Sequence, residues 1–247
     1  MVTGASSGIG RGLALEIASR GGNLGLLARR EELLKELIEE VRVRKVKAVA
    51  ATADVRDANA VREAAARFRE ELGPIDVLIA NAGIGTADDA IQLQPEHFAE
   101  VIGINLQGAV NSVVAVAPEM VARGQGRLVA ISSLAAYRGL PKSAAYCASK
   151  AALSAYFESV RLDLRGTGVG VTIIHPGFIK TALTSGREAK MPYLMELDHA
   201  VNKIVNAIEK EKKTYAFPWQ LATIVRAGMI MPTAMYDWIA IRNSFRE

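Results

Sequence analysis

Tyr146 and Lys150 carry the clearest chemical signal in this sequence. They stand four residues apart, at the start of a segment whose apolar spacing predicts a helix to about Arg165, so both side chains lie on one helix face. An ammonium about 4 Å from a phenolate, at an effective dielectric near 20, stabilises it by roughly 4 kcal/mol, enough to bring the phenol pKa from about 10 toward neutrality. The pair therefore predicts a general acid that protonates a carbonyl oxygen as hydride reaches the carbon.

Ser133 strengthens this prediction. It lies thirteen residues before Tyr146, directly after the apolar run Arg127–Ser132, and ligands of parallel sheets bind at the carboxyl ends of the strands. Its hydroxyl can hold the substrate oxygen. A tyrosine and a lysine four residues apart also arise by chance on ordinary helices, but the serine at a strand end makes a catalytic set the better interpretation.

A glycine-rich turn, Thr3 to Gly10, follows the first apolar run. Gly4 permits a turn that a side chain would strain, and Gly8 and Gly10 let the backbone approach a pyrophosphate. The helix after the turn offers free N–H groups and a partial positive charge to phosphates. Taken alone, this motif is equally compatible with a turn that binds no ligand.

Short apolar runs alternate with helical patterns along the whole chain. Several runs are β-branched and apolar on both faces, as strands covered by helices on both sides should be. Between them, Glu31–Val41 and Asp57–Leu72 have helical spacing, and Asp57 suits an N-cap. The pattern predicts an α/β fold, a doubly wound parallel sheet of about seven strands. The expected strands are Met1–Thr3, which is short for a central strand, Asn23–Ala28, Val46–Thr52, Ile75–Ala80, Arg127–Ser132, Val169–His175 and Thr214–Phe217.

Composition bounds the remaining function classes. The net charge is +4, but acidic and basic residues are interspersed along the chain, as on solvated helix faces, so we expect no nucleic-acid partner. Cys147 is the only cysteine. No disulfide can form within the chain, and we expect a reducing, cytoplasmic location. No signal peptide and no uninterrupted apolar run of about 18 residues are visible. We expect one domain over residues 1–247, with a helical extension from about residue 219.

Motifs along most of the chain resemble the short-chain dehydrogenase/reductase family, in that family's order. The resemblance implies a Rossmann-like fold, a nicotinamide cofactor and a catalytic set in which Asn105 completes a proton relay to Lys150 through water. It also implies that Asp54 and Val55 contact adenine. The matching motifs are Thr3–Gly10, Asn81-Ala82-Gly83, Asn105, Ser133, Tyr146 with Lys150, and Pro176-Gly177. The resemblance further assigns cofactor binding to Gly4, Ser6, Ser7, Gly8, Ile9, Gly10, Asn81, Ala82, Gly83, Tyr146, Lys150, Pro176, Gly177, Ile179 and Thr181.

The end of the second expected strand favours NADP over NAD. An NAD site generally has a carboxylate there to bind the ribose 2′-hydroxyl, whereas this chain has Ala28 followed by Arg29. A guanidinium can pair with a 2′-phosphate. The competing interpretation is that Arg29 and Arg30 only begin a solvated helix. Family members that use NADP often carry a base where this chain has Ser7, although serine hydroxyls can also bind the phosphate.

The other reactive residue types predict little chemistry. Cys147 points about 100° away from Tyr146 around the helix. His97 and His175 have no clustered partners in the sequence, so we expect no metal site. Tyr137 fits either a loop residue or a substrate contact.

These features predict an NADP-dependent enzyme that interconverts a carbonyl and an alcohol. The alternative is a nonenzymatic NADP-binding regulator on the same fold, which has no need of a proton donor such as Tyr146. Substrate contacts are expected in residues 134–144 and 178–197. The second segment contains Met191, Tyr193, Leu194, Met195 and Leu197, which suggests an apolar ligand, although the same segment can instead fold back on the core.

Two surfaces have more apolar residues than one core needs. The expected helices Gln107–Arg123 and Tyr146–Arg165 are apolar over a wide arc, and the family resemblance implies a homodimer or homotetramer through them. The residues are Val110, Val113, Val114, Val116 and Ala117, with Leu153, Tyr156, Phe157, Val160 and Leu164. After residue 219, two apolar helical stretches meet near Pro232. They either pack on the core, close over an apolar substrate or rest on a membrane, for which Trp219, Trp238, Arg242 and Arg246 are suitable residues.

Overall fold

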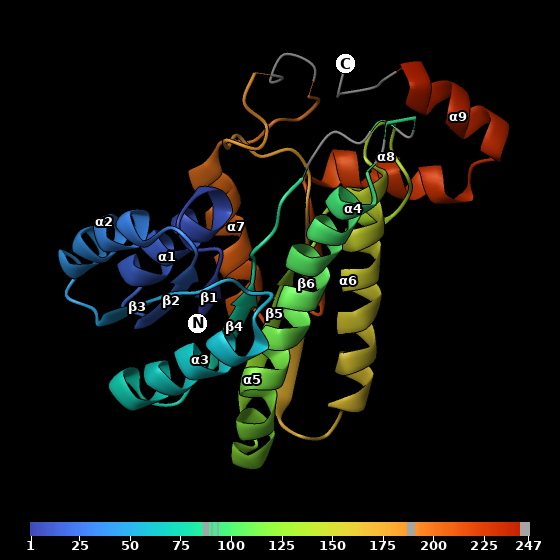
Figure 1. Cartoon of the computed structure of the whole chain (residues 1–247). Coiled ribbons are helices and arrows are strands. Elements are labelled where there is room, and N and C mark those ends of the chain that lie inside the picture. The colour runs from blue at the N-terminus through green and yellow to red at the C-terminus, as the bar shows by residue number, and fades with distance from the viewer. Residues whose placement is uncertain (86–88, 90, 93, 187–190, 243–247) are drawn as a thin grey trace.

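One sheet of seven parallel strands organises the fold (Figure 1). The computed structural model describes residues 1–85, 89, 91, 92, 94–186 and 191–242. The strands lie in the order β3-β2-β1-β4-β5-β6-β7, and every pair is parallel. This confirms the doubly wound α/β fold. The strands are β1 (Val2–Thr3), β2 (Leu24–Ala28), β3 (Ala48–Thr52), β4 (Val77–Ala80), β5 (Gly126–Ile131), β6 (Val169–Pro176) and β7 (Thr214–Phe217).

Helices cover both faces of the sheet, as the two-sided apolar strands predicted (Figure 1). One buried cluster joins the sheet to α1 (Gly8–Ser19), α2 (Glu31–Arg42) and α7 (Leu197–Glu209). A second cluster joins the opposite face to α3 (Ala58–Leu72), α5 (Gly108–Arg123) and α6 (Ala144–Asp163). The remaining described helices are α4 (Pro95–Ile102), a π-helical turn η1 (Gly103–Gln107), a 3-10 turn η2 (Leu134–Ala136), α8 (Trp219–Ile230) and α9 (Thr233–Arg242).

Local sequence signals set several of these boundaries. The Asp57 carboxylate accepts hydrogen bonds from the backbone N–H groups of Asn59 (2.9 Å) and Ala60 (3.1 Å), which confirms it as the N-cap of α3. β1 lies at the centre of the sheet, where Val2 aligns with Leu26 on one side and Ile79 on the other. Because β1 connects to β2 on one side while its other neighbour is β4, the strand order reverses there. That reversal opens a crevice at the carboxyl ends of the strands.

A continuous helical segment, Pro95–Arg123, combines α4, η1 and α5. Among the described residues, this helix alone is long and apolar enough to cross a membrane. Half of its most apolar 18-residue stretch is, however, buried inside the protein. Its Val113, Val116 and Met120 side chains pack in the second core cluster. We therefore interpret it as a core helix.

The wide apolar arcs on α5 and α6 belong partly to this core. Of the ten residues expected there, Val113, Val116, Leu153 and Phe157 are buried. Val114 remains exposed, and Val121 and Leu162 are exposed in addition. The surface left for a partner is narrower than the sequence suggested, because a helix on a sheet also buries residues that flank its central stripe.

Candidate active site

A cleft of about 530 Å³ opens at the carboxyl ends of β1, β2 and β4, where the strand order reverses. It extends from the glycine-rich turn to the start of α6, so it joins the expected cofactor and catalytic motifs. Fourteen of the residues proposed from the sequence line it: Gly4, Ser6, Ser7, Gly8, Ile9, Arg29, Asp54, Val55, Asn81, Ala82, Gly83, Tyr146, Lys150 and Thr181.

Lys150 lies at the floor of this cleft and is buried. Its Nζ donates a hydrogen bond to the Ile131 carbonyl oxygen at the end of β5 (2.8 Å) and stands 5.8 Å from the centre of the Tyr146 ring. Burial lowers the Lys150 pKa to about 8, since desolvation disfavours the ammonium. α6 thus places a buried amine, anchored to the sheet, beside a phenol, which is the arrangement that the four-residue spacing predicted.

Two glycines let the segment after β4 approach this pair closely. A Cβ on Gly83 would lie 3.2 Å from Asn105 Oδ1 and 3.4 Å from Lys150 Nζ. A Cβ on Gly85 would lie 3.2 Å from the Tyr146 ring. Both contacts are tight for a side chain, so glycine at these positions lets the backbone of this segment border Tyr146 and Lys150 without displacing them.

Asn105 holds the same segment from the other side. It is fully buried in the π-helical turn η1, a local widening that often occurs at functional sites. Its Oδ1 accepts from the Ile84 N–H (2.8 Å), and its Nδ2 donates to the Ile84 carbonyl (2.9 Å) and to Ser149 Oγ (2.9 Å). Asn105 therefore ties α6 to the segment after β4, and its Oδ1 and Lys150 Nζ both adjoin Gly83.

The two serines at the end of β5 have different surroundings. Ser132 Oγ donates to the Lys150 carbonyl (3.1 Å), and Ser132 is among the residues that line the cleft. Ser133 Oγ accepts from the Ala135 N–H (3.1 Å) and caps the turn η2. The Ser133 carbonyl lies 3.2 Å from His175 Nδ1, and the His175 ring stands 4.9 Å from that of Tyr137. Ser132 therefore contacts α6, whereas the contacts of Ser133 are with η2 and His175.

The glycine-rich turn is fixed by contacts from the end of β4. Thr3 Oγ1 accepts from the backbone N–H groups of Asn81 and Ala82, both at 3.1 Å, and Asn81 Nδ2 donates to the Thr3 carbonyl (3.0 Å). A Cβ on Gly10 would lie 2.2 Å from the Gly4 carbonyl oxygen, so this crossing of turn and helix requires glycine. No side chain caps the start of α1 at Ser7, which leaves the first N–H groups of that helix available to an anion.

Arginine side chains surround the far end of the cleft. The Arg30 guanidinium donates to Ser6 Oγ through Nε (3.2 Å) and Nη2 (2.9 Å), and Nη2 also donates to Ser7 Oγ (2.5 Å). Arg29 is half exposed, and its Nη1 lies 3.8 Å from Asp54. Hydrogen bonds from Arg56 hold the Asp54 pKa below its usual value. The sequence singled out Arg29, whereas the structure adds Arg30 as the cation that touches the glycine turn.

Some proposed residues lie outside the lining of the cleft: Gly10, Asn105, Ser133, Pro176, Gly177 and Ile179. Ile179 is buried in the first core cluster. Lining residues that the sequence did not single out include Arg30, Ile84, Gly85 and Ile104, whereas Leu183 belongs to the expected substrate segment 178–197. Arg30 had one signal, its place beside Arg29; the other three had none. Residues 187–190 of the expected substrate segment, and Arg246, lie outside the described residues.

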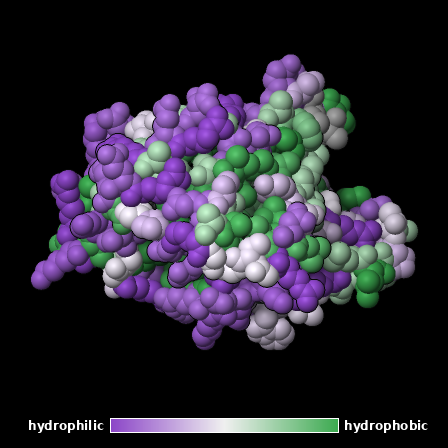
Figure 2. All heavy atoms as spheres, turned by 90° about the horizontal axis from the view of Figure 1, so that it is seen from below, coloured by the Kyte–Doolittle hydropathy of each residue, from purple (hydrophilic) through white to green (hydrophobic). Residues whose placement is uncertain are grey.

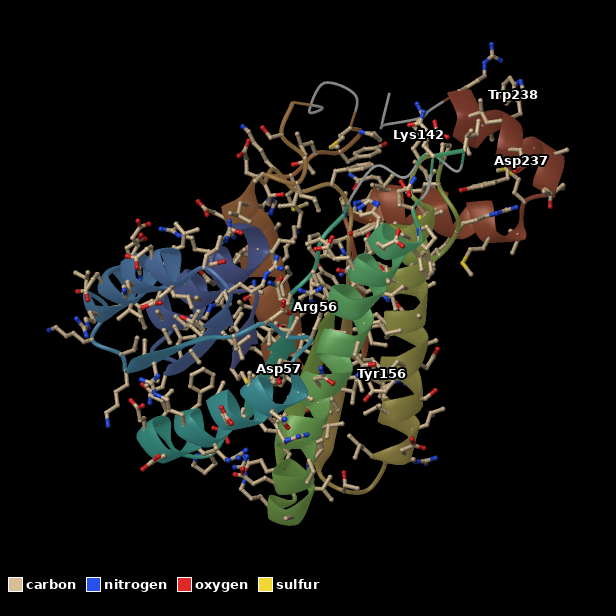
Figure 3. All side chains as sticks on the ribbon, in the orientation of Figure 1. Arg56, Asp57, Lys142, Tyr156, Asp237 and Trp238 are labelled. Carbon is tan, nitrogen blue, oxygen red and sulfur yellow. The ribbon has the colours of Figure 1, made fainter. Side chains whose placement is uncertain are left out.

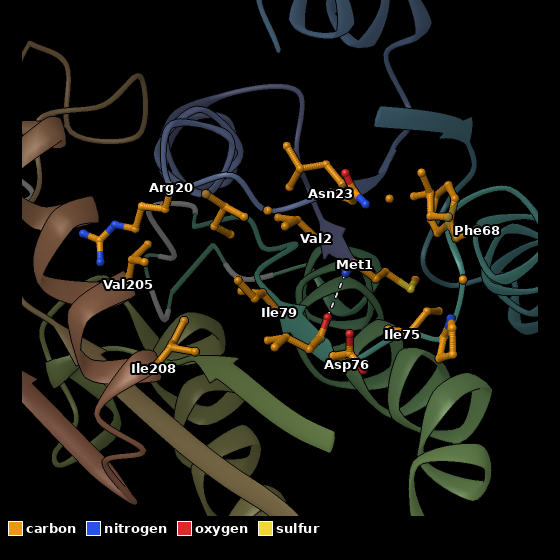
Figure 4. A pocket seen from close by; sticks show the side chains of 18 of the residues that line it. Met1, Val2, Arg20, Asn23, Phe68, Ile75, Asp76, Ile79, Val205 and Ile208 are labelled. Atoms are coloured by element: carbon orange, nitrogen blue, oxygen red, sulfur yellow. Dashed lines mark hydrogen bonds between the residues drawn. The ribbon is translucent and has the colours of Figure 1, made fainter. Parts of the chain in front are cut away.

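A second cavity, of about 400 Å³, lies at the amino ends of the strands (Figure 4). Met1, Val2, Asp76 and Val77 line it where β1 and β4 begin. Its lining is largely apolar and includes Ile17, Phe68 and Ile208. No group of three potential metal ligands occurs among the described residues. The motifs singled out from the sequence line the other cleft, at the carboxyl ends of the strands.

The comparisons with known proteins agree with this geometry. Residues 1–192 match the family model for short chain dehydrogenases. An uncharacterised oxidoreductase of Myxococcus xanthus is 43% identical over 98% of this chain and 96% of its own length. An uncharacterised oxidoreductase of Mycobacterium tuberculosis is 35% identical over 94% of this chain and 93% of its own length. The chain belongs to the short-chain dehydrogenase/reductase family and is similar throughout to oxidoreductases.

Solved structures of the family share the fold. An alcohol dehydrogenase from Thermococcus sibiricus, complexed with 5-hydroxy-NADP, has a TM-score of 0.79 at 26% identity and covers 87% of this chain and 93% of its own. An NAD+-bound xylitol dehydrogenase has a TM-score of 0.80 at 26% identity and covers 87% of this chain and 95% of its own. One neighbour carries an NADP derivative and the other NAD+, so these structures support a nicotinamide nucleotide site and leave the choice between the two cofactors to the residues of this chain.

Proposed function

We propose that this protein is an NADP(H)-dependent oxidoreductase that interconverts a carbonyl and an alcohol on an apolar substrate. The observation that carries the proposal is the buried Lys150 amine, which stands beside the Tyr146 ring at the floor of the cleft. A buried amine with a depressed pKa costs stability, and groups of this kind concentrate at functional sites. We propose that the enzyme works in the cytoplasm.

The residues of the cleft fit a nicotinamide dinucleotide. At Gly4 and Gly10 the turn is packed too tightly for a Cβ, and the start of α1 has no side-chain cap. Pyrophosphate oxygens fit such a helix terminus. Asp54 and Val55 border the end of the cleft next to Arg29 and Arg30, where the adenosine would lie. When bound, the cofactor supplies or accepts the hydride.

The protein's own residues would handle the proton. Tyr146 would donate a proton to the carbonyl oxygen, or accept one from the alcohol. The Lys150 amine, held by the Ile131 carbonyl, would favour the deprotonated phenol when it carries its own proton. The Ser133 hydroxyl would orient the substrate oxygen. Asn105 would keep the backbone after β4 in place around Gly83, next to Lys150 Nζ.

Tyr146→Phe tests this assignment. The ring keeps its packing against Gly85 and loses only the proton donor, so we expect kcat to fall at least about 100-fold with an unchanged melting temperature. Cys147→Ser is a matched control, since the thiol adjoins Tyr146 in the chain and has no role in the proposal. Normal turnover by Tyr146→Phe contradicts the mechanism. Tight NADPH binding without turnover of any carbonyl in a broad panel favours the nonenzymatic regulator instead.

The preference for NADP rests on the two arginines and the absence of a carboxylate at Ala28. Arg30 bonds both serines of the turn, so its guanidinium is already oriented toward the space where a 2′-phosphate would lie. We expect Arg30→Ala to raise the NADPH KM about 10- to 100-fold, the loss of one or two charge-assisted hydrogen bonds. Arg29→Asp should shift preference toward NADH. Arg44→Ala, on an exposed turn after α2, is the control. A parent enzyme that prefers NADH refutes the assignment.

A further inference from the structure

The last two described helices, α8 and α9, form an arm that displays apolar side chains to solvent. Of the fifteen large hydrophobic residues that are exposed in the described chain, seven fall within Trp219–Arg242. α9 has no buried residue at all. Figure 2 shows apolar patches among polar ones on the lobe at its right-hand edge, the side on which α8 and α9 lie in Figure 1. The seven residues are Trp219, Ile224, Met229, Ile230, Met235, Trp238 and Ile241, with Ile230 the most exposed at 88%.

The arm is fixed to the body at its base and at its bend. Leu221 and Ala222 are buried against Leu134 of η2, which accounts for the part of the arm that serves the core. At the bend, the Arg138 guanidinium donates to the carbonyls of Gly228 and Met231. It also lies 3.8 Å above the ring of Tyr236.

The Tyr236 hydroxyl in turn donates to the Gly139 carbonyl. The arm is therefore held in place by polar contacts, and its apolar side chains are not needed to attach it. Seven exposed large apolar side chains on two consecutive helices favour an interaction site on the arm.

Charge on and around the arm points to an anionic partner. Residues 219–242 hold Arg226, Asp237 and Arg242, and the adjoining residues 137–143 add Arg138 and Lys142. These two segments thus hold four cationic residues and one anionic residue. The Arg242 guanidinium lies 4.6 Å from the Trp238 ring, and Figure 3 shows Trp238 on the outer side of α9. A tryptophan and an arginine in contact suit the boundary between lipid tails and headgroups.

We propose that α8 and α9 dock this protein on an anionic lipid bilayer, with the mouth of the cleft close to the lipid. A bilayer suits α9 better than a protein face does, because a fluid phase covers several sides of an unburied apolar helix at once. A second copy would bring like-charged arms together in a symmetric contact. A helix of ten residues is too short to cross the bilayer, so the arm would lie within the interface.

Docking there would couple membrane and substrate. Arg138, which holds the bend, is five residues beyond Ser133 in the same segment. Leu183, which lines the cleft, is exposed. In Figure 1, α8 and α9 lie at the end of the sheet where the strands terminate. Entry of an apolar substrate from the bilayer into the cleft rests on the proposed function, whereas binding of the arm to the bilayer does not.

The test is flotation of the purified full chain with phosphatidylcholine vesicles, with and without about 30% phosphatidylglycerol, at roughly 0.1 M salt. We expect binding to the anionic vesicles, and at least tenfold weaker binding for a variant that combines Ile230→Ser, Trp238→Ser and Ile241→Ser. Its melting temperature should not change, because all three side chains are exposed. Val43→Ser removes an equally exposed apolar side chain on the far side of the fold (80% exposed) and should bind normally.

Several results overturn the proposal. They are a parent chain that does not float with anionic vesicles, a triple variant that binds like Val43→Ser, and a triple variant whose mass by light scattering falls to half, which assigns the arm to a second copy. The assay also separates the two proposals, because Tyr146→Phe should float normally. Loss of vesicle binding with intact turnover therefore concerns only the arm, and loss of the proposed chemistry leaves the flotation result unaffected.

Discussion

Burial of the Lys150 ammonium should make the stability of this protein depend on pH in the alkaline range. The pKa of the amine falls from 10.5 to about 8 on folding, because the side chain is withdrawn from water. Below pH 8 both the folded and the unfolded chain hold the proton, and the folded state carries a penalty of about 3 kcal/mol. Between pH 8 and 10.5 the folded chain loses the proton while the unfolded chain keeps it, so the penalty disappears and stability rises with pH.

The size of the effect can be isolated by comparing Tyr146→Phe with the double variant Tyr146→Phe/Lys150→Met. The shared Phe substitution removes the titration of the neighbouring phenol, and other titrating groups cancel in the difference. Methionine keeps most of the side-chain volume but cannot donate a hydrogen bond to the Ile131 carbonyl. The free energy lost with that bond does not change with pH, so it does not affect the pH dependence of the difference. The Lys150-containing protein should gain about 2 kcal/mol relative to the double variant between pH 7 and 9.5.

Urea unfolding at the two pH values measures this difference directly. The same comparison shows whether the lysine is kept for function at the expense of stability. If the difference between the two proteins stays flat from pH 7 to 9.5, the Lys150 amine is hydrated or paired in the folded state, and the argument that a desolvated amine tunes Tyr146 fails.

Three further predictions concern the scaffold and assembly. Asp57→Ala should lower the free energy of unfolding by about 1 kcal/mol, since two N–H groups of α3 lose their acceptor; Asp57→Asn should restore most of it in the same urea titration. Gly10→Ala should abolish NADPH binding measured by calorimetry, because its Cβ would overlap the Gly4 carbonyl; an unchanged Kd refutes the close crossing. Light scattering at micromolar concentration should show a homodimer or homotetramer. Leu162→Glu should dissociate it, and a monomeric parent chain contradicts the proposal.

Periodicity and motif spacing determined the architecture of this protein. Two-sided apolar runs require helices on both faces, and ligands of parallel sheets bind at the carboxyl ends of the strands, so the sequence alone placed Ser133 at a strand end on that edge. The four-residue spacing of Tyr146 and Lys150 fixed their shared helix face. Predictions of this kind hold in the folded protein because they depend on the local geometry of helices and strands, which tertiary packing rarely changes.

Only the tertiary structure decided the features that depend on contacts between distant segments. Arg30 reaches Ser6 and Ser7 across the cleft, which its position after β2 alone does not reveal. The π-helical segment η1 orients the Asn105 side chain toward Ile84, and nothing in the residue spacing predicts a π-helix there. Burial likewise divided the apolar residues of α5, α6 and α8. Hydrophobicity indicates only that burial of a side chain is favourable. The tertiary packing determines whether the protein's own core buries it or whether it stays exposed to a partner.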